Sequence, residues 1–143
     1  MKLQLVTLDG IKFEADAYSI VLPTAAGEIT VLPSHEPLLS QVVPGVITIR
    51  KDKHDPDYHL EHFATYGGVV EVRRESVRVL VDEATSGDEV NEAEAQKAHD
   101  AAVALRKEAK EQVDLDKAQA LVDRQAVRLK VAQLRRQQSA RRR

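Results

Sequence analysis

The stretch GEITVLPSHEPLLSQVVPG, residues 27 to 45, holds two short apolar runs separated by a segment with a proline at each end. The runs are Ile29 to Leu32 and Leu38 to Val43, and the prolines between them are Pro33 and Pro37. Because proline fixes φ and has no N–H to donate to a sheet, the chain must leave the sheet between the runs, and it must turn again at Pro44-Gly45. The stretch therefore predicts two β-strands joined by a rigid, exposed loop over residues 33–37.

Short segments with strand character flank this stretch. Residues 2–8 and 11–14 surround Asp9-Gly10, a dipeptide that favours a two-residue hairpin turn. Further strands are expected at residues 18–22, where Pro23 ends the run, and at residues 46–49, 58–66, 69–72 and 77–81. Strands this short and closely spaced, with no helical period among them, predict an antiparallel sandwich or barrel of about nine or ten strands in residues 1–86.

Composition limits the class of protein. Of 143 residues, 43% are hydrophobic and only 3% are aromatic, and Cys and Trp are absent. These values predict one or two small domains with an aliphatic core, and the lack of Cys excludes disulfides and thiolate chemistry. No run approaches the roughly 18 apolar residues of a membrane span, and the N-terminal MKLQLVTLDG does not resemble a signal peptide. We expect an intracellular protein with no direct membrane insertion.

From residue 87 onward the pattern changes to that of helices. Ser86 or Asp88 can cap a first helix, whose first turns are rich in acidic residues that suit the positive end of the helix dipole. A break near residues 113–116, with capping candidates Asp114 and Asp116, precedes a second helix that continues toward the C-terminus.

Each helix carries an apolar stripe at helical spacing, and the stripe of the first helix is mostly alanine. The first stripe is Ala98, Ala101, Ala102, Leu105, Ala109 and Val113, and the second is Leu115, Ala118, Val122, Ala126 and Leu129. The short joint and the matching stripes predict an antiparallel helix hairpin. The expected fold class is therefore α+β, with a β-sandwich domain in residues 1–86 and a two-helix domain in residues 87–143.

The second helix has another apolar stripe on its opposite side. This stripe consists of Ala120, Val127, Val131 and Leu134, set among Arg124, Arg128, Lys130 and Arg135. A simple two-helix hairpin leaves it unused, so it must meet either the β domain of the same chain or another protein. The sequence leaves both alternatives open.

Charge divides the chain. Residues 1–86 hold 8 basic and 13 acidic residues, a net charge of −5, whereas residues 117–143 hold 9 basic residues and one acid, a net charge of +8. A strongly basic terminal segment implies an acidic partner, which could be protein, nucleic acid or phospholipid. Because an alanine-rich hairpin buries little apolar surface, we expect it to be weakly held and able to undock.

Together these segments resemble a known family. GEITVLPSHEPLL, GGVVEV at residues 67–72, VRVLVDEA at residues 77–84 and the alanine-rich helix pair resemble the epsilon subunit of bacterial and chloroplast F-type ATP synthases. The resemblance covers essentially the whole chain. It implies a non-catalytic central-stalk (rotor) subunit of a proton-translocating enzyme, peripheral at the cytoplasmic face of the cell membrane. In that family the β-sandwich contacts the gamma subunit and the c ring, and the helices regulate ATP hydrolysis.

The resemblance also implies site residues. Positions near gamma and the c ring correspond to Glu28, Pro33, Ser34, His35 and Glu36. The alternative is that Glu28 solvates a turn and that His35 orders its own loop. The regulatory tail, which would reach acidic segments of the alpha and beta subunits when extended, corresponds to Arg124, Val127, Arg128, Val131, Leu134, Arg135 and Arg136. For the arginines, the alternative is a solvated helix face.

One motif departs from the family. Members that bind ATP carry Ile or Leu, Asp, two variable residues, Arg and Ala, whereas the matching residues 90–95 have Asn91 in place of the Asp and Glu94 in place of the Arg. A carboxylate repels phosphate oxygens that a guanidinium would bind. We therefore expect no ATP binding.

The residues also argue against catalysis, a metal or a cofactor. There is no Gly-rich phosphate loop, and Ser34 beside His35 does not make a triad, because adjacency in sequence does not bring the two side chains into reach. His59 and His62, three apart in an expected strand, would face opposite ways and bind no common metal. The remaining alternative is a basic-tailed nucleic-acid-binding or nucleotide-sensing module. We expect no nucleic-acid partner, since residues 1–86 are acidic and the sheet lacks exposed aromatics.

Overall fold

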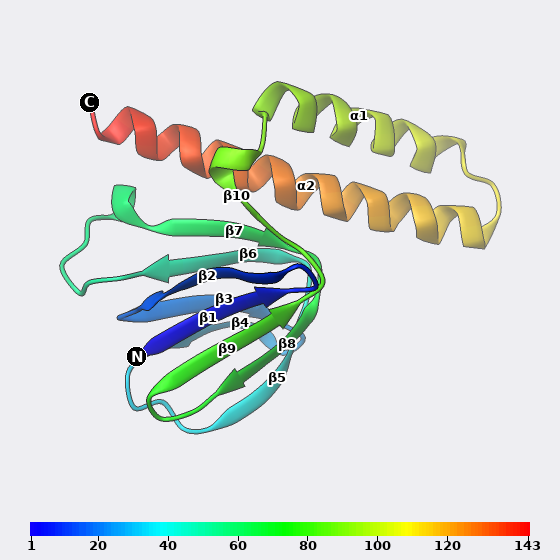
Figure 1. Ribbon diagram of the computed structural model, residues 1–143. Coiled ribbons are helices and arrows are strands. Elements are labelled where there is room, and N and C mark those ends of the chain that lie inside the picture. Colours follow the sequence, from blue (N-terminus) through cyan, green and yellow to red (C-terminus); the bar gives the residue numbers. More distant parts are fainter.

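The computed structural model describes residues 1–143 and shows ten strands followed by two helices (Figure 1). The strands are β1 (Lys2–Thr7), β2 (Gly10–Asp16), β3 (Ser19–Thr24), β4 (Gly27–Val31), β5 (Leu38–Val42), β6 (Gly45–Arg50), β7 (Glu61–Thr65), β8 (Gly68–Val72), β9 (Ser76–Val81) and β10 (Ala84–Ser86). The helices are α1 (Glu92–Glu108) and α2 (Gln112–Arg141), with short 3₁₀ helices η1 (Asp57–His59) and η2 (Gly87–Glu89). We call β1–β10 with η1 the β body, and α1 with α2 the tail. The expected α+β class is confirmed.

The strands form one folded sheet in the order β10-β7-β6-β3-β5-β8-β9-β1-β2, with β4 paired to β3. All pairs are antiparallel except β1 with β9, which is parallel. β3 joins the two halves of the sheet, because it pairs with β6 through residues 19–21 and with β5 at Thr24. The two apolar runs of residues 27–45 form β4 and β5, which do not pair with each other. β4 pairs with β3, and β5 pairs mainly with β8 and with β3 only at Thr24.

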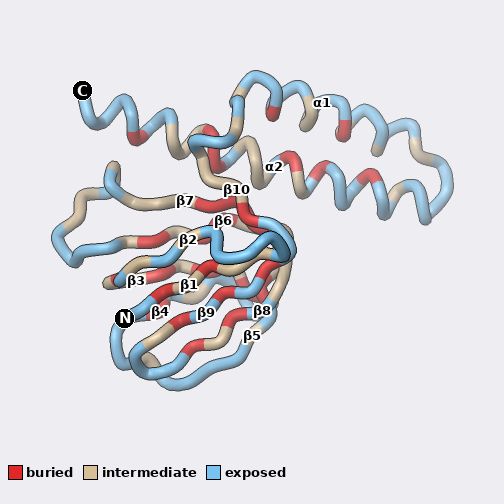
Figure 2. Tube along the Cα trace, in the orientation of Figure 1, coloured by how far each residue is buried: buried red, intermediate tan, exposed pale blue.

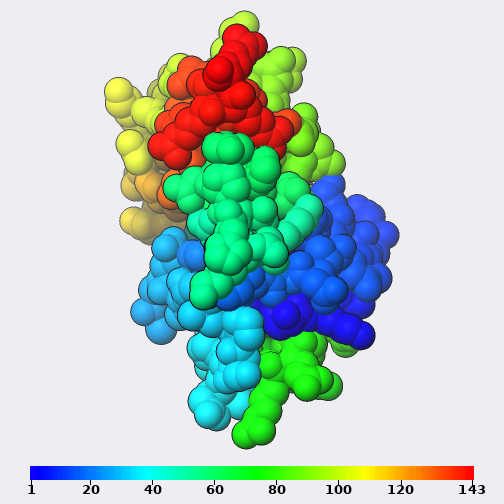
Figure 3. Space-filling model, turned by 90° about the vertical axis from the view of Figure 1, so that its left-hand side faces the viewer, coloured from blue at the N-terminus to red at the C-terminus, as the bar shows by residue number.

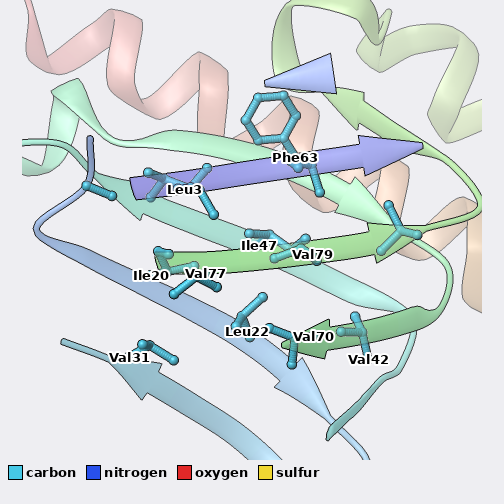
Figure 4. Packing of buried hydrophobic residues seen from close by; sticks show 14 of the residues in the cluster. Leu3, Ile20, Leu22, Val31, Val42, Ile47, Phe63, Val70, Val77 and Val79 are labelled. Atoms are coloured by element: carbon cyan, nitrogen blue, oxygen red, sulfur yellow. The ribbon is translucent and has the colours of Figure 1, made fainter. Parts of the chain in front are cut away.

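Aliphatic side chains fill the space between the two halves. Alternate residues of each strand point inward, as the period of two in a strand requires. Figure 2 shows buried positions on the strands of both halves, and Figure 4 shows the side chains that meet between them. The largest fully buried ones are Leu3, Leu5, Ile20, Leu22, Val31, Val42, Ile47, Ile49, Val70, Val72, Val77 and Val79. The predicted aliphatic core is confirmed.

Pro23 does not end its strand, which corrects one expectation. β3 continues to Thr24, and Pro23 pairs with Glu28 of β4. The carbonyl of Pro23 accepts from the N–H of Val43. On this edge β3 pairs with β6 before Pro23 and with β5 after it, so no neighbouring strand needs an N–H from residue 23. Gly45 allows the start of β6 to approach the Pro23 side chain closely, because a Cβ at position 45 would lie 2.7 Å from the Cβ of Pro23.

The expected strand over residues 58–66 is shorter. Its first part is the 3₁₀ turn η1, closed by the N–H of His59 donating to Pro56 O at 2.9 Å, and β7 begins only at Glu61. The short strand β10 was not expected, because three residues are too few to show alternation. It pairs with β7 through Ala84↔Thr65, so it brings the start of the tail to this edge of the sheet.

The helix hairpin is confirmed, but its details differ. α1 is capped by Asn91, whose side chain accepts from Glu94 N at 3.1 Å, and not by Ser86 or Asp88. The break lies at residues 109–111, so Asp114 and Asp116 are inside α2 and cap nothing. Glu111 precedes α2 without a side-chain cap.

Only small side chains of the two stripes are buried between the helices. The buried members are Ala102, Ala118 and Val122, joined by Ala95, and Figure 2 shows buried positions on the facing sides of α1 and α2. Leu105 and Val113 are 52% and 61% exposed, and Ala101 and Ala126 are also exposed. The close approach that alanines allow leaves larger side chains at the edges of the contact.

Candidate functional site

The tail is held to the β body through one part of α2. α2 contacts β6, β7, η1 and η2, while α1 packs against α2 on its outer side (Figure 1). Figure 3 shows the red C-terminal end of α2 lying on the green segment around η1. The other end of the hairpin extends beyond the sheet, so one interface determines whether the tail is docked.

Apolar side chains occupy the centre of this interface. Val131 is 0% exposed and packs with Val46 and Ala64 of the sheet, with Val127 and Leu134 at its sides. The second stripe of α2 therefore meets the β body in this structure. Ala120, the remaining stripe member, is exposed, because that turn of α2 lies beyond the contact.

Ion pairs surround the apolar centre. Arg124 pairs with Glu83, and its guanidinium carbon lies 4.0 Å from the ring centroid of Tyr66. Arg135 pairs with Asp88 of η2. Three of the four arginines assigned to the tail are thus paired within the chain, since Arg136 lies 3.1 Å from Glu92 of α1, whereas Arg128 forms no ion pair.

Two further tail residues, not identified from the sequence, bind backbone carbonyls of the β body. Gln138 is 6% exposed, and its Nε2 donates to Leu60 O at 2.8 Å and to Asp57 O at 3.2 Å. Arg142 Nη2 donates to Tyr58 O at 3.1 Å. Gln138 lies seven residues after Val131, so helical spacing places it on this face, although its polar side chain belongs to neither the apolar stripe nor the basic residues.

The linker η2 is fastened on two sides. Ser86 and Glu89 form a capping box, and Glu89 accepts from Lys12 Nζ of β2 at 2.6 Å. The hydrogen bonds from Lys12 and from the Ser86 N–H lower the pKa of Glu89. On the other side, Gly87 lies against α2, where a Cβ would be 2.9 Å from Arg135 Cβ and 3.1 Å from Val131 O. Glycine at 87 is therefore needed for α2 to approach this closely.

Two titratable side chains lie under the tail. His62 of β7 is half-buried, and burial lowers its pKa, an effect partly offset by Glu61. Tyr66 lies beneath Arg124, and burial raises its pKa. His59 lies in η1 and not in a strand with His62, so the geometry expected for the pair was wrong, and no group of three or more His, Asp or Glu converges for a metal.

The expected loop after β4 has a defined conformation. Ser34 adopts φ 65°, the N–H of His35 donates to Leu32 O at 3.1 Å, and His35 Nδ1 lies 2.7 Å from Glu36 O. The loop lies on the side of the β body away from the helices (Figure 1). Pro33, Ser34, His35 and Glu36 are together there. Glu28 is at the opposite end of β4, about 15 Å away along a strand of this length, so the structure does not bring it into the same cluster.

Neither α1 nor α2 combines the length and the apolar character that a membrane-crossing helix needs.

Comparison with known proteins supplies the family context. Residues 1–87 match the family described as ATP synthase, Delta/Epsilon chain, beta-sandwich domain. Two proteins described as ATP synthase epsilon chain match over nearly their whole lengths. The one from Herpetosiphon aurantiacus is 32% identical over 95% of this chain and 96% of its own. The one from Laribacter hongkongensis is 34% identical over 94% and 90%.

Solved structures share the fold. A chain of the Euglena gracilis mitochondrial ATP synthase OSCP/F1/c-ring assembly superposes with a TM-score of 0.76 at 20% identity, covering 91% of this chain and 79% of that one. A chain of the Tetrahymena thermophila mitochondrial ATP synthase central stalk/c-ring assembly gives a TM-score of 0.51 at 20% identity, covering 62% and 68%.

Proposed function

Because the chain belongs to the ATP synthase delta/epsilon chain family, we propose that it is a non-catalytic rotor subunit in the central stalk of a proton-translocating F-type ATP synthase. The observation that carries this proposal is the match to epsilon chains along both the β body and the tail. Its partners are then a gamma subunit and a c ring, and it is peripheral at the cytoplasmic face of the membrane. Residues 1–86 and 87–143 act as separate domains.

The β body supplies the fixed attachment. The loop of Pro33, Ser34, His35 and Glu36 is held by its own hydrogen bonds and is largely exposed, so it presents a preformed surface to gamma or the c ring. Glu28 is exposed at the other end of β4 and contacts a separate part of these partners. The loop and the tail lie on different sides of the β body, so attachment leaves the tail free to move (Figure 1).

The tail supplies regulation. Arg124 and Arg135 are paired with acids of the same chain when the tail is docked, and each exposed pair of this kind contributes only about 0–1 kcal/mol. Acidic segments of the alpha and beta subunits can therefore compete with Glu83 and Asp88 for the same arginines. In the extended position, Arg128, Arg136 and the apolar residues of α2 join that contact, and ATP hydrolysis is inhibited.

The segment that aligns with the ATP motif has other roles here. Asn91 caps α1 and Glu92 pairs with Arg136 at 3.1 Å, while Glu94 places a carboxylate where phosphate would need a cation. These contacts support regulation without bound ATP. The nucleic-acid alternative is disfavoured by the acidic β body, since residues 1–86 carry a net charge of −5 and would repel a polyanion.

Deletion of residues 112–143 from the assembled enzyme tests both parts of the proposal. We expect the shortened chain to co-purify with gamma and the c ring, and ATP hydrolysis by the complex to rise severalfold. Failure of the full-length chain to co-purify would refute the stalk role. Normal assembly with unchanged hydrolysis would refute only the regulatory tail.

A further inference from the structure

His62 lies under the part of α2 that holds the tail. It is paired in register with Thr48 of β6, and its Nδ1 is 3.0 Å from Thr48 Oγ1. Ala64, two residues further along β7, points to the same face of the sheet and is covered by Val131. The imidazole is thus on the surface that α2 covers.

The space around His62 is too small for any ligand larger than water. A crevice of about 40 Å³ separates the imidazole from η2 and α2, and its walls include Gly87, Asp88, Arg135, Gln138 and Arg142. Closing or opening this crevice requires movement of α2, since the sheet side is fixed by β6 and β7.

The crevice already holds two cationic side chains. Arg135 of α2 and Arg142, the residue after α2, contribute guanidinium groups, and η2 contributes Asp88, whose carboxylate already binds Arg135. On the remaining sides, Glu61 of the same strand is paired with Lys51 at 3.0 Å, and His59 of η1 is 3.7 Å from Asp55. A proton on His62 would therefore add a positive charge to a crevice that already holds two guanidinium groups, and Glu61 offsets only part of the cost of burying that charge.

We propose that His62 makes tail docking sensitive to pH: the neutral imidazole permits α2 to rest on the sheet, and protonation of the imidazole favours release of α2. The regulatory consequence rests on the proposed function, because release is the step that leads to the extended, inhibitory tail. Acidification would then increase inhibition of ATP hydrolysis.

The sign follows from proton linkage. With the tail docked, burial lowers the pKa of His62 below its ordinary value of 6.5, and with the tail released the exposed side chain returns toward that value. Protons therefore bind more strongly to the released form. Docking is strongest above the ordinary histidine range and weakens as pH falls through it toward the lowered value.

Fluorescence energy transfer on the full-length chain tests the proposal. The chain has no native Cys, so Lys53→Cys and Gln137→Cys, both at exposed positions, can carry a donor and an acceptor. Between about pH 8 and about pH 5.5, a range in which carboxylates stay ionised and histidine titrates, we expect the released fraction to rise severalfold. His62→Gln, which stays neutral and can still bond Thr48, should abolish that rise, whereas His59→Gln and His99→Gln should retain it.

An NMR titration and a salt titration separate the role of His62 from the mobility of the tail. NMR titration of the His62 imidazole in the wild-type chain should follow the same pH curve as the energy transfer, and this does not depend on how well a variant folds. Raising salt at pH 8 should release the tail by screening its ion pairs. Release by salt but not by acid, or an unchanged pH response in His62→Gln, would overturn the role of His62 alone. A tail that stays docked under both conditions would overturn the proposed mobile tail as well.

Discussion

The absence of a side chain at Gly87 allows the tail to pack closely against η2. A Cβ at this position would lie 2.9 Å from Arg135 Cβ and 3.1 Å from Val131 O. We predict that Gly87→Val shifts the tail toward the released form while the sheet remains folded, because the added atoms meet α2 and not the core. Energy transfer between labels at positions 53 and 137 measures the shift. Ala93→Val, at an exposed position of α1, is the matched control and should leave docking unchanged.

Glu89 gives a prediction about stability and pH. Its pKa is lowered from 4.5 by hydrogen bonds from Lys12 and the Ser86 N–H, so its contribution to folding is present above pH 4.5 and is lost as pH falls through the lowered value. We predict that Glu89→Gln lowers the free energy of unfolding at neutral pH and that the difference from wild type disappears in acid. Denaturant titrations at several pH values measure it. Glu108→Gln, which removes an exposed carboxylate without an ion pair, should show no such difference; an equal loss there would contradict the assignment.

At the level of elements, the sequence predicted which faces of α2 are apolar but not what each face contacts. Periodicity places Val131 and Leu134 on one side of the helix and Ala118 and Val122 on the other, and both sides are used. The partner of a face depends on residues far away in the chain, and Val46 is 85 positions from Val131. For that reason the sequence alone does not predict what the second stripe contacts.

The predicted start of the first helix and end of the third strand were wrong for a related reason. Ser86, Asp88 and Asn91 are all good caps by residue type, and the choice among them depends on how η2 fits between β2 and α2. Pro23 is similar, because a proline is compatible with a strand wherever the neighbouring ladder makes no demand on its N–H. The loop over residues 33–37 was easier to predict, since Pro33 and Pro37 act on the chain locally.

Val131→Ala tests how α2 is held. Val131 is 0% exposed in the docked tail, so removing two methyl groups should weaken docking by about 1.5 kcal/mol, or about tenfold in the docking equilibrium. Val113→Ala makes the same chemical change on the same helix at a side chain that is 61% exposed and should have little effect. Energy transfer at constant pH and salt gives both values. Equal effects of the two changes would show that the Val131 contact does not hold the tail.

At the scale of the whole molecule, the division of charge has a structural purpose. The acidic β body and the basic end of the tail attract each other through pairs such as Arg124 with Glu83 and Arg135 with Asp88. The same attraction is available to any acidic partner that presents a comparable surface. The net charges therefore predicted an acidic contact but not which acidic surface makes it. A docked tail and an extended tail are alternatives for one set of arginines.

A covalent tether between tail and β body tests this competition. Arg142 donates to Tyr58 O, so Tyr58→Cys with Arg142→Cys places two thiols within reach of a short bifunctional maleimide, and no native Cys competes. We predict that the assembled enzyme carrying the cross-linked chain hydrolyses ATP as fast as one carrying the chain without residues 112–143, because a docked tail cannot reach the alpha and beta subunits. Before cross-linking, hydrolysis should be inhibited severalfold.

The single change Tyr58→Cys, treated with the same reagent, separates the tether from simple modification and should keep the inhibition. The tether also distinguishes the tail from the body as the source of any pH effect, since acid acting through His62 requires α2 to leave the sheet. In the cross-linked enzyme, hydrolysis should therefore lose the part of its pH dependence that tail release causes. Persistent inhibition after complete cross-linking would show that the β body, and not a mobile tail, restrains the motor.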